Sequence, residues 1–335
     1  MFEYEIKKVV RWIKDNGFRR VLIQSPLGLR GEAVKVLRLL EDEDIDALLS
    51  GSNCWGGCDV AYSQAKVVNA DAVIHMGHSR FLERDEVPTY YLECRYSDLH
   101  PLLSLAEKFS KILPHGSVGV GLTVQWLNGL DAFLNKLREH GLKPYVGEAE
   151  GVLRHRGQVL GCGYSSLLKL SSLVDSFLIV GSIFHGLGLA LQTRKKVYAG
   201  DPHTQRIIDL ERDVERVLRA RYAQIELFKK AEKVGIIVSV KPGQRRMGLA
   251  LRLKSMLEEA GKEADIIAVD EVEEESLADF PYQGYVNTAC PRLSIEDQMR
   301  LQRPLLLPSE VSVALSKASW ESIIRTPRYL AMGVV

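Results

Sequence analysis

The sequence lacks several features that would place a protein in a common class. No apolar run approaches the roughly 18 residues that a membrane-spanning helix needs. Residues 1–18 form an amphipathic helical pattern with charges throughout, unlike a signal peptide. The 44 Lys and Arg residues almost balance the 43 Asp and Glu residues, so no bulk charge attracts nucleic acid or an anionic membrane. We therefore expect a cytoplasmic chain with no membrane partner and no direct nucleic-acid partner.

Cysteine is also scarce. The 335 residues include five cysteines, an odd number and too few for a disulfide scaffold, so we expect reduced thiols. Neither the phosphate-binding pattern G-x-x-x-x-G-K-[ST] nor the dinucleotide pattern G-x-G-x-x-G occurs. The composition, 46% hydrophobic and 26% charged, is that of a folded globular protein. The five cysteines are Cys54, Cys58, Cys94, Cys162 and Cys290.

What the sequence does contain is one unit repeated three times. Each copy shows a strand, a polar loop, an amphipathic helix and a further strand, and the copies open with RVLIQSPLGLR, SVGVGLTVQ and VGIIVSVKPGQ. A glutamine ends or follows each opening strand: Gln24, Gln125 and Gln244. Gly141 and Gly261 stand where a glycine commonly ends a helix. β-branched runs such as residues 236–238 favour buried parallel strands.

The repeat predicts an α/β fold of three pseudo-symmetric small domains, each a mostly parallel sheet with flanking helices, around a shared central site. The expected boundaries are 1–100, 101–203 and 204–335. We expect a long polar connecting helix over about 204–233, with its arginines, including Arg221, on a solvated face. The acidic run 270–275 is interpreted as a solvated loop, and 295–308 as a shorter version of the helix and strand that follow the cysteine in the other copies.

A cysteine closes each copy of the repeat. Cys58, Cys162 and Cys290 follow the three glutamines by 34, 37 and 46 positions. Ligand-facing loops of parallel sheets lie at the carboxyl ends of the strands, so three such loops from three similar domains can converge. We therefore expect the three thiolates to meet at one point, one from each domain. Cys54 and Cys94 are interpreted as spectators.

Two kinds of metal centre suit three converging thiolates. Zinc would need a fourth ligand such as His78 or His185. An iron–sulfur cluster is favoured because no C-x₂-C pair occurs, and three thiolates on a 4Fe–4S cube would leave one iron open to a substrate. The usual radical-enzyme signature C-x₃-C-x₂-C is absent: Cys54 and Cys58 have the first spacing, but Ala61 occupies the third position.

At these residues the chain closely resembles the archaeal diphthamide-synthesis family, the 2-(3-amino-3-carboxypropyl)histidine synthases, which are non-canonical radical S-adenosylmethionine enzymes. The resemblance runs in order from Val21 to Gln298, through VLIQSPLGL, NCWGGCDVAY, VIHMGHS, GLTVQWL, VLGCGYSS, VGSIFHGLGLAL, AGDPHTQ, RYAQIE, GIIVSVKPGQ and TACPRLSIEDQ. It implies three α/β domains around a 4Fe–4S cluster, with Cys58, Cys162 and Cys290 as ligands, usually in a homodimer.

The resemblance also implies a reaction. A reduced cluster cleaves the bond between sulfur and the methionine γ-carbon of S-adenosylmethionine. The 3-amino-3-carboxypropyl group then joins C2 of a histidine imidazole of elongation factor 2, and an external electron donor is required. The candidate contacts to S-adenosylmethionine or substrate are Arg292, Gln125, Gln244, Gln24, His78 and His185. Arg292 suits the methionine carboxylate because a guanidinium pairs with it bidentately, although a structural ion pair is the alternative.

Two other functions remain open. A quinolinate-synthase-like lyase would use a similar three-cysteine cluster as a Lewis acid, but CPRLSIED and HMGHS fit the diphthamide family and not the lyase. A non-catalytic cluster-binding or zinc-binding partner of a catalytic paralogue is the second alternative, and the complete set of three cysteines counts against it.

Overall fold

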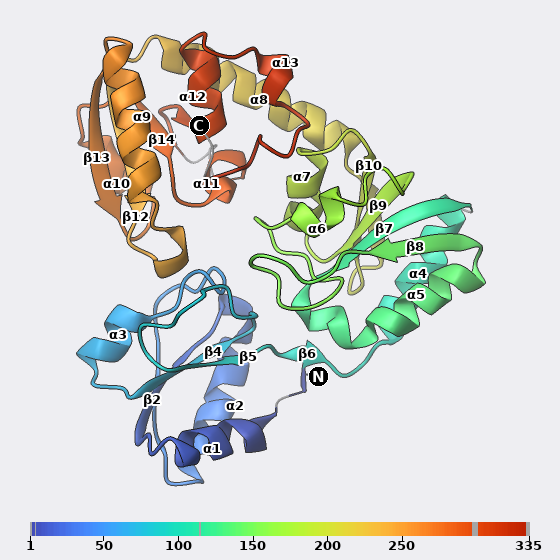
Figure 1. Ribbon diagram of the computed structural model, residues 1–335. Coiled ribbons are helices and arrows are strands. Elements are labelled where there is room, and N and C mark those ends of the chain that lie inside the picture. The colour runs from blue at the N-terminus through green and yellow to red at the C-terminus, as the bar shows by residue number, and fades with distance from the viewer. Residues whose placement is uncertain (1, 4, 114, 297–300, 333–335) are drawn as a thin grey trace.

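The computed structural model describes residues 2–3, 5–113, 115–296 and 301–332. Three separate sheets surround a common centre (Figure 1). The first has the strand order β3-β2-β4-β5, and all its pairs are parallel. Its strands are β2 (Arg20–Gln24), β3 (Asp46–Leu49), β4 (Ala72–Met76) and β5 (Thr89–Leu92).

The second and third sheets repeat this order. The second is β11-β10-β9-β7-β8, parallel except for the added edge strand β11, and the third is β13-β12-β14-β15, all parallel. Their strands are β7 (Gly116–Leu122), β8 (Leu142–Val146), β9 (Ser176–Val180), β10 (Lys196–Asp201), β11 (Arg206–Asp209), β12 (Lys233–Ser239), β13 (Glu263–Val269), β14 (Gly284–Asn287) and β15 (Leu305–Leu306).

In every sheet the opening strand pairs with the second strand of its unit on one side and with the third on the other. This arrangement creates a topological switch point, beside which a crevice opens at the carboxyl ends of the strands. The predicted fold class, three mostly parallel sheets with flanking helices, is confirmed.

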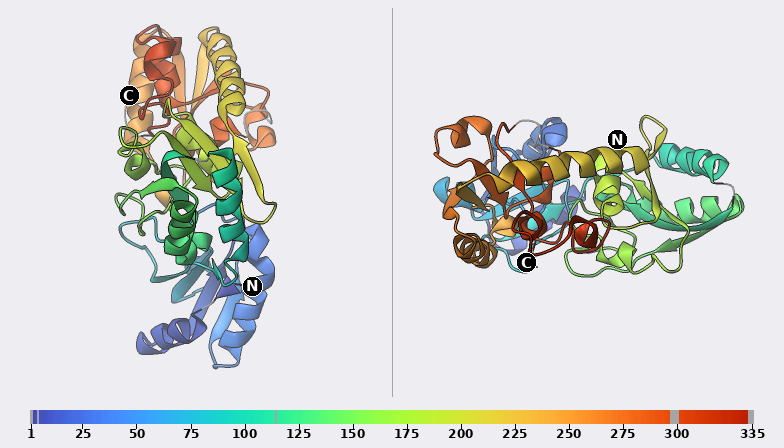
Figure 2. Two further views of the ribbon diagram at one scale, coloured as in Figure 1. Left: turned by 90° about the vertical axis from the view of Figure 1, so that its right-hand side faces the viewer. Right: turned by 90° about the horizontal axis from the view of Figure 1, so that it is seen from above.

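Helices cover the sheets (Figures 1 and 2). The longer ones are α1 (Ile6–Asp15), α2 (Arg30–Glu41), α4 (His100–Ile112), α5 (Leu130–Glu139), α7 (Ile183–Ala190), α8 (Glu211–Lys229) and α9 (Met247–Glu259). The shorter ones are η1 (Leu27–Leu29), α3 (Tyr62–Val67), η2 (Val124–Gly129), α6 (Ser165–Leu168), η3 (Pro242–Gln244), α10 (Glu274–Ala278), α11 (Pro291–Ile295), α12 (Pro308–Ala314) and α13 (Trp320–Ile323). A small antiparallel pair joins β1 (Phe2–Glu3) to β6 (Arg95–Tyr96). No described helix is long and apolar enough to cross a membrane.

The third repeat differs from the prediction in one respect. Cys58 and Cys162 follow the second strand of their units, β3 and β8, whereas Cys290 follows the third strand, β14. The three positions are therefore not equivalent, which explains the longer spacing of 46 residues before Cys290. The strand that corresponds to β4 and β9 is β14, and not the predicted segment 295–308. Residues 297–300 of that segment lie outside the described residues. In the third unit the acidic run 270–275 occupies the loop that carries the cysteine in the other two.

The connecting helix is also shorter than predicted. It begins at Glu211, because Arg206–Asp209 instead form β11 and pair with β10 at the edge of the second sheet. In α8, Val214, Leu218 and Ile225 enter one hydrophobic core that is shared by the second and third sheets. The first sheet has cores of its own.

Arg221 on α8 is buried, at 2% exposure, and does not belong to a solvated face. Its guanidinium forms two hydrogen bonds to the carboxylate of Glu310, at 3.0 and 2.5 Å, and donates to the carbonyls of Ser294 and Leu305. Tyr329 donates a further hydrogen bond to Glu310 at 2.9 Å. Although burial opposes charge, this carboxylate raises the pKa of Arg221. Helical periodicity alone could not locate an ion pair whose partner lies 89 residues away.

We expect Glu310→Leu to lower the free energy of unfolding by about 3–5 kcal/mol, because it leaves the buried guanidinium uncompensated. Denaturant unfolding followed by circular dichroism measures the change. Replacing both partners, Arg221→Met with Glu310→Leu, should recover most of the loss. Arg219→Ala, which removes the exposed pair with Glu215, should leave stability nearly unchanged. A double variant no more stable than Glu310→Leu alone would contradict this account.

Candidate functional site

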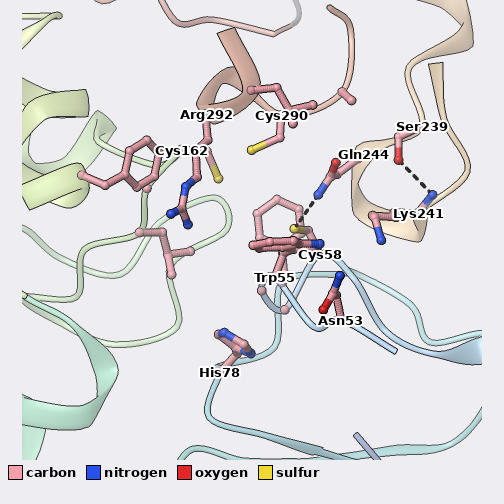
Figure 3. A pocket seen from close by; sticks show the side chains of 18 of the residues that line it. Asn53, Trp55, Cys58, His78, Cys162, Ser239, Lys241, Gln244, Cys290 and Arg292 are labelled. Atoms are coloured by element: carbon pink, nitrogen blue, oxygen red, sulfur yellow. Dashed lines mark hydrogen bonds between the residues drawn. The ribbon is translucent and has the colours of Figure 1, made fainter. Parts of the chain in front are cut away.

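A cavity of about 650 Å³ opens where loops of the three sheets meet. Residues from all three units line it, including the thiols of Cys58, Cys162 and Cys290 (Figure 3). The three sulfur atoms point toward one another across the cavity (Figure 3). The structure therefore brings together the three cysteines that the repeat singled out.

Burial raises the pKa of the Cys58 and Cys162 thiols, and repulsion from the neighbouring sulfurs raises both further. The pKa of Cys58 rises to about 11 despite the hydrogen bond from Gln244, and that of Cys162 rises more. All five cysteines carry thiols and none forms a disulfide. Three converging thiols become thiolates together when a cation compensates their charge, as a bound metal does.

The η3 loop of the third unit lies directly against the Cys58 loop of the first. The amide of Gly243 donates to the carbonyl of Cys58 at 2.8 Å, and Gln244 Nε2 lies 3.4 Å from Cys58 Sγ. A Cβ at Gly243 would lie only 2.6 Å from Cys58 Cβ. The glycine therefore permits the close approach that places Gln244 on the sulfur.

A buried lysine strengthens the same junction. Lys241 Nζ contacts Asp59 at 3.1 Å and Glu271 at 2.9 Å, and Glu271 also accepts a hydrogen bond from the indole of Trp55 at 3.0 Å. Burial opposes the charge of Lys241, but the two carboxylates prevail and raise its pKa. The sequence reasoning missed Lys241, Asp59 and Trp55, although all three lie inside motifs it quoted, KPGQ and NCWGGCDV.

The acidic run 270–275 lines the cavity and is not simply a solvated loop. Its position follows from the topology, because it occupies the place after β13 that corresponds to the cysteine loops of the other units. Lys241 compensates its first two carboxylates, Asp270 and Glu271. The remaining acidic side chains give that part of the cavity wall a negative charge.

Arg292 lines the cavity from α11 (Figure 3). Its Nε donates to Glu296 at 2.6 Å, and its guanidinium lies 5.1 Å from the ring centre of Phe184. The predicted alternative, an ion pair, is therefore present. It engages the Nε side of the guanidinium, while the head group extends toward the cavity between Cys162 and His78 (Figure 3).

The three glutamines differ in their positions. Gln244 and Gln125 line the cavity, and Gln125 also donates to the carbonyl of Gly77 at 2.7 Å. Gln24 does not line it, and its candidate role as a contact is corrected. Its buried amide donates to the carbonyl of Asp59 and accepts from the amide of Ala61 and from His75, and these bonds hold it behind the cavity wall.

His78 lines the cavity from the loop after β4, and His185 lines it from the first turn of α7, the helix that follows β9. Burial lowers the pKa of each to about 4; His185 opposes protonation of His78, and Arg292 opposes that of His185. Both rings are therefore neutral at physiological pH. His185 Nδ1 lies 2.8 Å from the hydroxyl of Ser182, and His78 Nδ1 lies 3.1 Å from His75 Nε2.

The other two cysteines lie outside the cavity lining. Cys94 is buried at 2% exposure, and its thiol contacts the carbonyl of Leu92. Cys54 is buried behind the wall, 4.0 Å from His75 Nε2 and 3.9 Å from His78 Nδ1. Cys54, His75 and His78 are the one group of possible metal ligands found among the described residues outside the converging thiols.

The donor set of the cavity suits an iron–sulfur cluster. It presents three thiols from three units, and the amide of Gln244 donates a hydrogen bond to one of their sulfurs. The carboxylates near Cys58 are already paired with Lys241. Thiolates are the protein ligands of 4Fe–4S clusters, and hydrogen bonds to their sulfurs tune the reduction potential. Three protein ligands leave one coordination position for another molecule. The cavity volume, about 650 Å³, leaves room for that molecule.

Comparisons with known proteins agree with this geometry. The chain is 37% identical over 332 residues to the 2-(3-amino-3-carboxypropyl)histidine synthase of Pyrococcus horikoshii, covering 97% of this chain and 95% of that one. It is 26% identical over 326 residues to subunit 1 of the corresponding synthase of Candida glabrata, covering 94% of this chain and 74% of the relative. The human subunit 1 is also 26% identical, over 330 residues, with 96% and 73% covered.

Solved structures give the same result. The structure of Dph2 from Pyrococcus horikoshii with a 4Fe–4S cluster superimposes with a TM-score of 0.86 at 36% identity, covering 95% of this chain and 93% of that one. The family model described as diphthamide synthesis protein matches residues 25–324. The chain therefore belongs to the diphthamide synthesis protein family.

Proposed function

We propose that the chain is a 2-(3-amino-3-carboxypropyl)histidine synthase. It transfers the 3-amino-3-carboxypropyl group of S-adenosylmethionine to imidazole C2 of a histidine of elongation factor 2, the first step of diphthamide biosynthesis. The observation that carries the proposal is the convergence of three thiols from three units on one cavity, in a chain whose relative of the same fold holds a 4Fe–4S cluster. The 37% identical relative bears the name of this activity.

Cys58, Cys162 and Cys290 are the proposed ligands of a 4Fe–4S cluster. Such a cluster, when bound and reduced, supplies one electron to a substrate held at the iron that has no protein ligand. The chain contributes the shape around that position. Gln244 donates to the sulfur of Cys58, and the clamp of Lys241 with Asp59 and Glu271 keeps the first and third units together beside it.

The cavity wall offers contacts for S-adenosylmethionine. Arg292 carries a guanidinium beside Cys162 and Cys290, where it can pair with the methionine carboxylate (Figure 3). His185 lies within electrostatic reach of Arg292, and Gln125 and Gln244 present amides to the same cavity. These groups would decide which carbon–sulfur bond faces the open iron. His78 stands on the side of the first unit and is proposed to face the acceptor.

The remaining parts of the proposal concern partners. An external donor must reduce the cluster, and the resemblance implies a homodimer and a cytoplasmic setting. A net charge of +1 provides no long-range attraction for elongation factor 2, so docking depends on local charge. The acidic side chains at 273–275 and the half-exposed Trp55 line the cavity and are the proposed first contacts for the incoming histidine loop.

After anaerobic reconstitution, we expect each of three variants to bind about tenfold less iron than the wild type, or less still: Cys58→Ala, Cys162→Ala and Cys290→Ala. Each of them removes a thiolate ligand. Iron analysis and the visible charge-transfer absorbance measure the loss. Cys54→Ala and Cys94→Ala are the matched controls and should keep the cluster. Loss in Cys54→Ala with retention in Cys58→Ala would overturn the ligand assignment.

The reaction is tested by incubating the reconstituted chain anaerobically with dithionite, S-adenosylmethionine and elongation factor 2. We expect mass spectrometry to find a 3-amino-3-carboxypropyl adduct on one histidine. Formation of 5′-deoxyadenosine alone, or no transfer, would reject the function. A loaded cluster with no transfer would favour the non-catalytic partner, and consumption of quinolinate precursors would favour the lyase.

Arg292→Ala should raise the KM for S-adenosylmethionine about 10- to 100-fold, since a charge-assisted hydrogen bond to a carboxylate contributes about 1.5–3 kcal/mol. Glu296→Gln, which changes only the outer partner of Arg292, is the control and should shift KM much less. Initial rates against S-adenosylmethionine concentration give both values. An unchanged KM in Arg292→Ala would restrict Arg292 to its ion pair.

A further inference from the structure

The inference begins at the buried amide of Gln24, whose orientation is fixed by two backbone groups. Its Nε2 donates to the carbonyl of Asp59 at 2.7 Å, and its Oε1 accepts from the amide of Ala61 at 3.0 Å. A carbonyl cannot donate and an amide N–H cannot accept, so the side-chain amide cannot be reversed without losing both bonds. The Gln24 oxygen is therefore an acceptor.

This fixes the tautomer of His75. Its Nδ1 lies 2.9 Å from Gln24 Oε1, and since that oxygen carries no hydrogen, Nδ1 must hold the proton of the bond. His75 is fully buried, and burial holds its pKa well below the usual value, so the ring is neutral. The other nitrogen, Nε2, is consequently a bare acceptor.

The same logic reaches His78. Its Nδ1 lies 3.1 Å from His75 Nε2, so Nδ1 carries the hydrogen of this bond. The ring of His78 is also neutral at physiological pH, since burial and the neighbouring His185 lower its pKa to about 4. His78 Nε2 is left with an unshared pair, and the side chain lines the cavity (Figure 3). Two backbone groups, the carbonyl of Asp59 and the amide of Ala61, thus determine through Gln24 and His75 which nitrogen of His78 is basic.

The backbone supports this orientation. Gly77 has a φ of +83°, and a Cβ there would lie 2.7 Å from Leu29 Cδ1. This turn lets His75 stay in β4 while His78, three residues later, reaches the cavity. The titratable groups beside the two rings are Cys54 and Tyr91, which stay protonated because burial raises their pKa values, and His185 across the cavity. A carboxylate raises the pKa of neither ring.

The proposed reaction needs a base. One electron enters as the carbon–sulfur bond of S-adenosylmethionine breaks, leaving 5′-methylthioadenosine and a carbon radical, which forms a bond to imidazole C2. To restore the aromatic ring, the C2 adduct must then lose the proton of its C2–H bond and one electron. A bound 4Fe–4S cluster, oxidised in the first step, would take that electron back. Over the whole reaction one C–S and one C–H bond break, one C–C bond forms, and one proton is released.

We propose that His78 Nε2 accepts this proton, with His75 and Gln24 as positioning residues that keep the nitrogen bare. This inference rests on the proposed function and deepens it by assigning the base for its last step. The adduct that has lost its electron is a cation, and its C2–H is strongly acidic. A neutral imidazole is sufficient to accept such a proton, and its neutrality keeps it ready at physiological pH.

The first experiment separates bond cleavage from transfer in the reconstituted enzyme. For His78→Gln we expect 5′-methylthioadenosine to form within a few fold of the wild-type rate, while the modified histidine falls about 100-fold or more. His75→Leu should show a smaller loss, and elongation factor 2 deuterated at histidine C2 should reveal a primary isotope effect in this variant that the wild type lacks. His140→Gln, an exposed histidine after α5, is the control and should match the wild type.

If the modified histidine and 5′-methylthioadenosine fall by the same factor in His78→Gln, the assignment is overturned. It is also overturned if neither of them falls. If the wild type forms neither, the proposed function itself has failed. The two failures are therefore distinguishable.

The second experiment needs no cluster. In apo protein labelled with ¹⁵N-histidine, long-range NMR correlations should show His78 protonated at Nδ1 and bare at Nε2 at neutral pH, with assignments from His78→Gln and His75→Gln. In Gln24→Leu the His75 ring should lose its single tautomer. A bare Nδ1 on His78 would overturn the proposal. So would one equivalent of zinc that disappears in Cys54→Ser, because Cys54, His75 and His78 would then be a metal site.

Discussion

The contact between the η3 loop and the Cys58 loop is the interaction on which the site depends. It joins the first unit to the third through a backbone hydrogen bond, a close approach that a glycine permits, and a buried lysine held by two carboxylates. The first sheet has its own hydrophobic cores, whereas the second and third share one. Polar contacts at this junction therefore set where Cys58 stands relative to the other two thiols.

A second set of polar contacts joins the first unit to the second. His155 Nε2 lies 2.6 Å from Glu93, and Gln158 donates to Ser79 at 2.9 Å. Burial opposes ionisation of Glu93, but hydrogen bonds from His155, Ser79 and Arg95 prevail and lower its pKa. Hydrogen bonds are directional, so these joints fix orientation more narrowly than an apolar face would. That precision matters where three loops must supply ligands to one centre.

The two sides of the cavity have different chemistry. Arg292 and the neutral His185 come from the third and second units, and they suit an anionic head group next to two of the thiols. The first unit contributes His78, with a hydrogen-bond chain behind it that leads away from the cavity to Gln24. The glutamines at similar points of the three repeats thus have different roles. Gln244 donates to a sulfur, Gln125 donates to a backbone carbonyl, and Gln24 orients His75.

Periodicity and repeat order are local properties of the chain, so the three units, their parallel strands and the three converging cysteines could be predicted from the sequence. It placed Cys290 in the wrong loop of its unit and placed Arg221 and the acidic run on solvated faces. The folded chain shows where these residues lie, and it also shows the roles of Lys241, Asp59 and the Gln24–His75–His78 chain. They depend on contacts such as that of Gln24 with His75, 51 residues away, and that of Lys241 with Asp59, 182 residues away, or on which strand a loop follows. Spacing along the chain carries no record of such contacts; they arise when the carboxyl ends of three sheets meet.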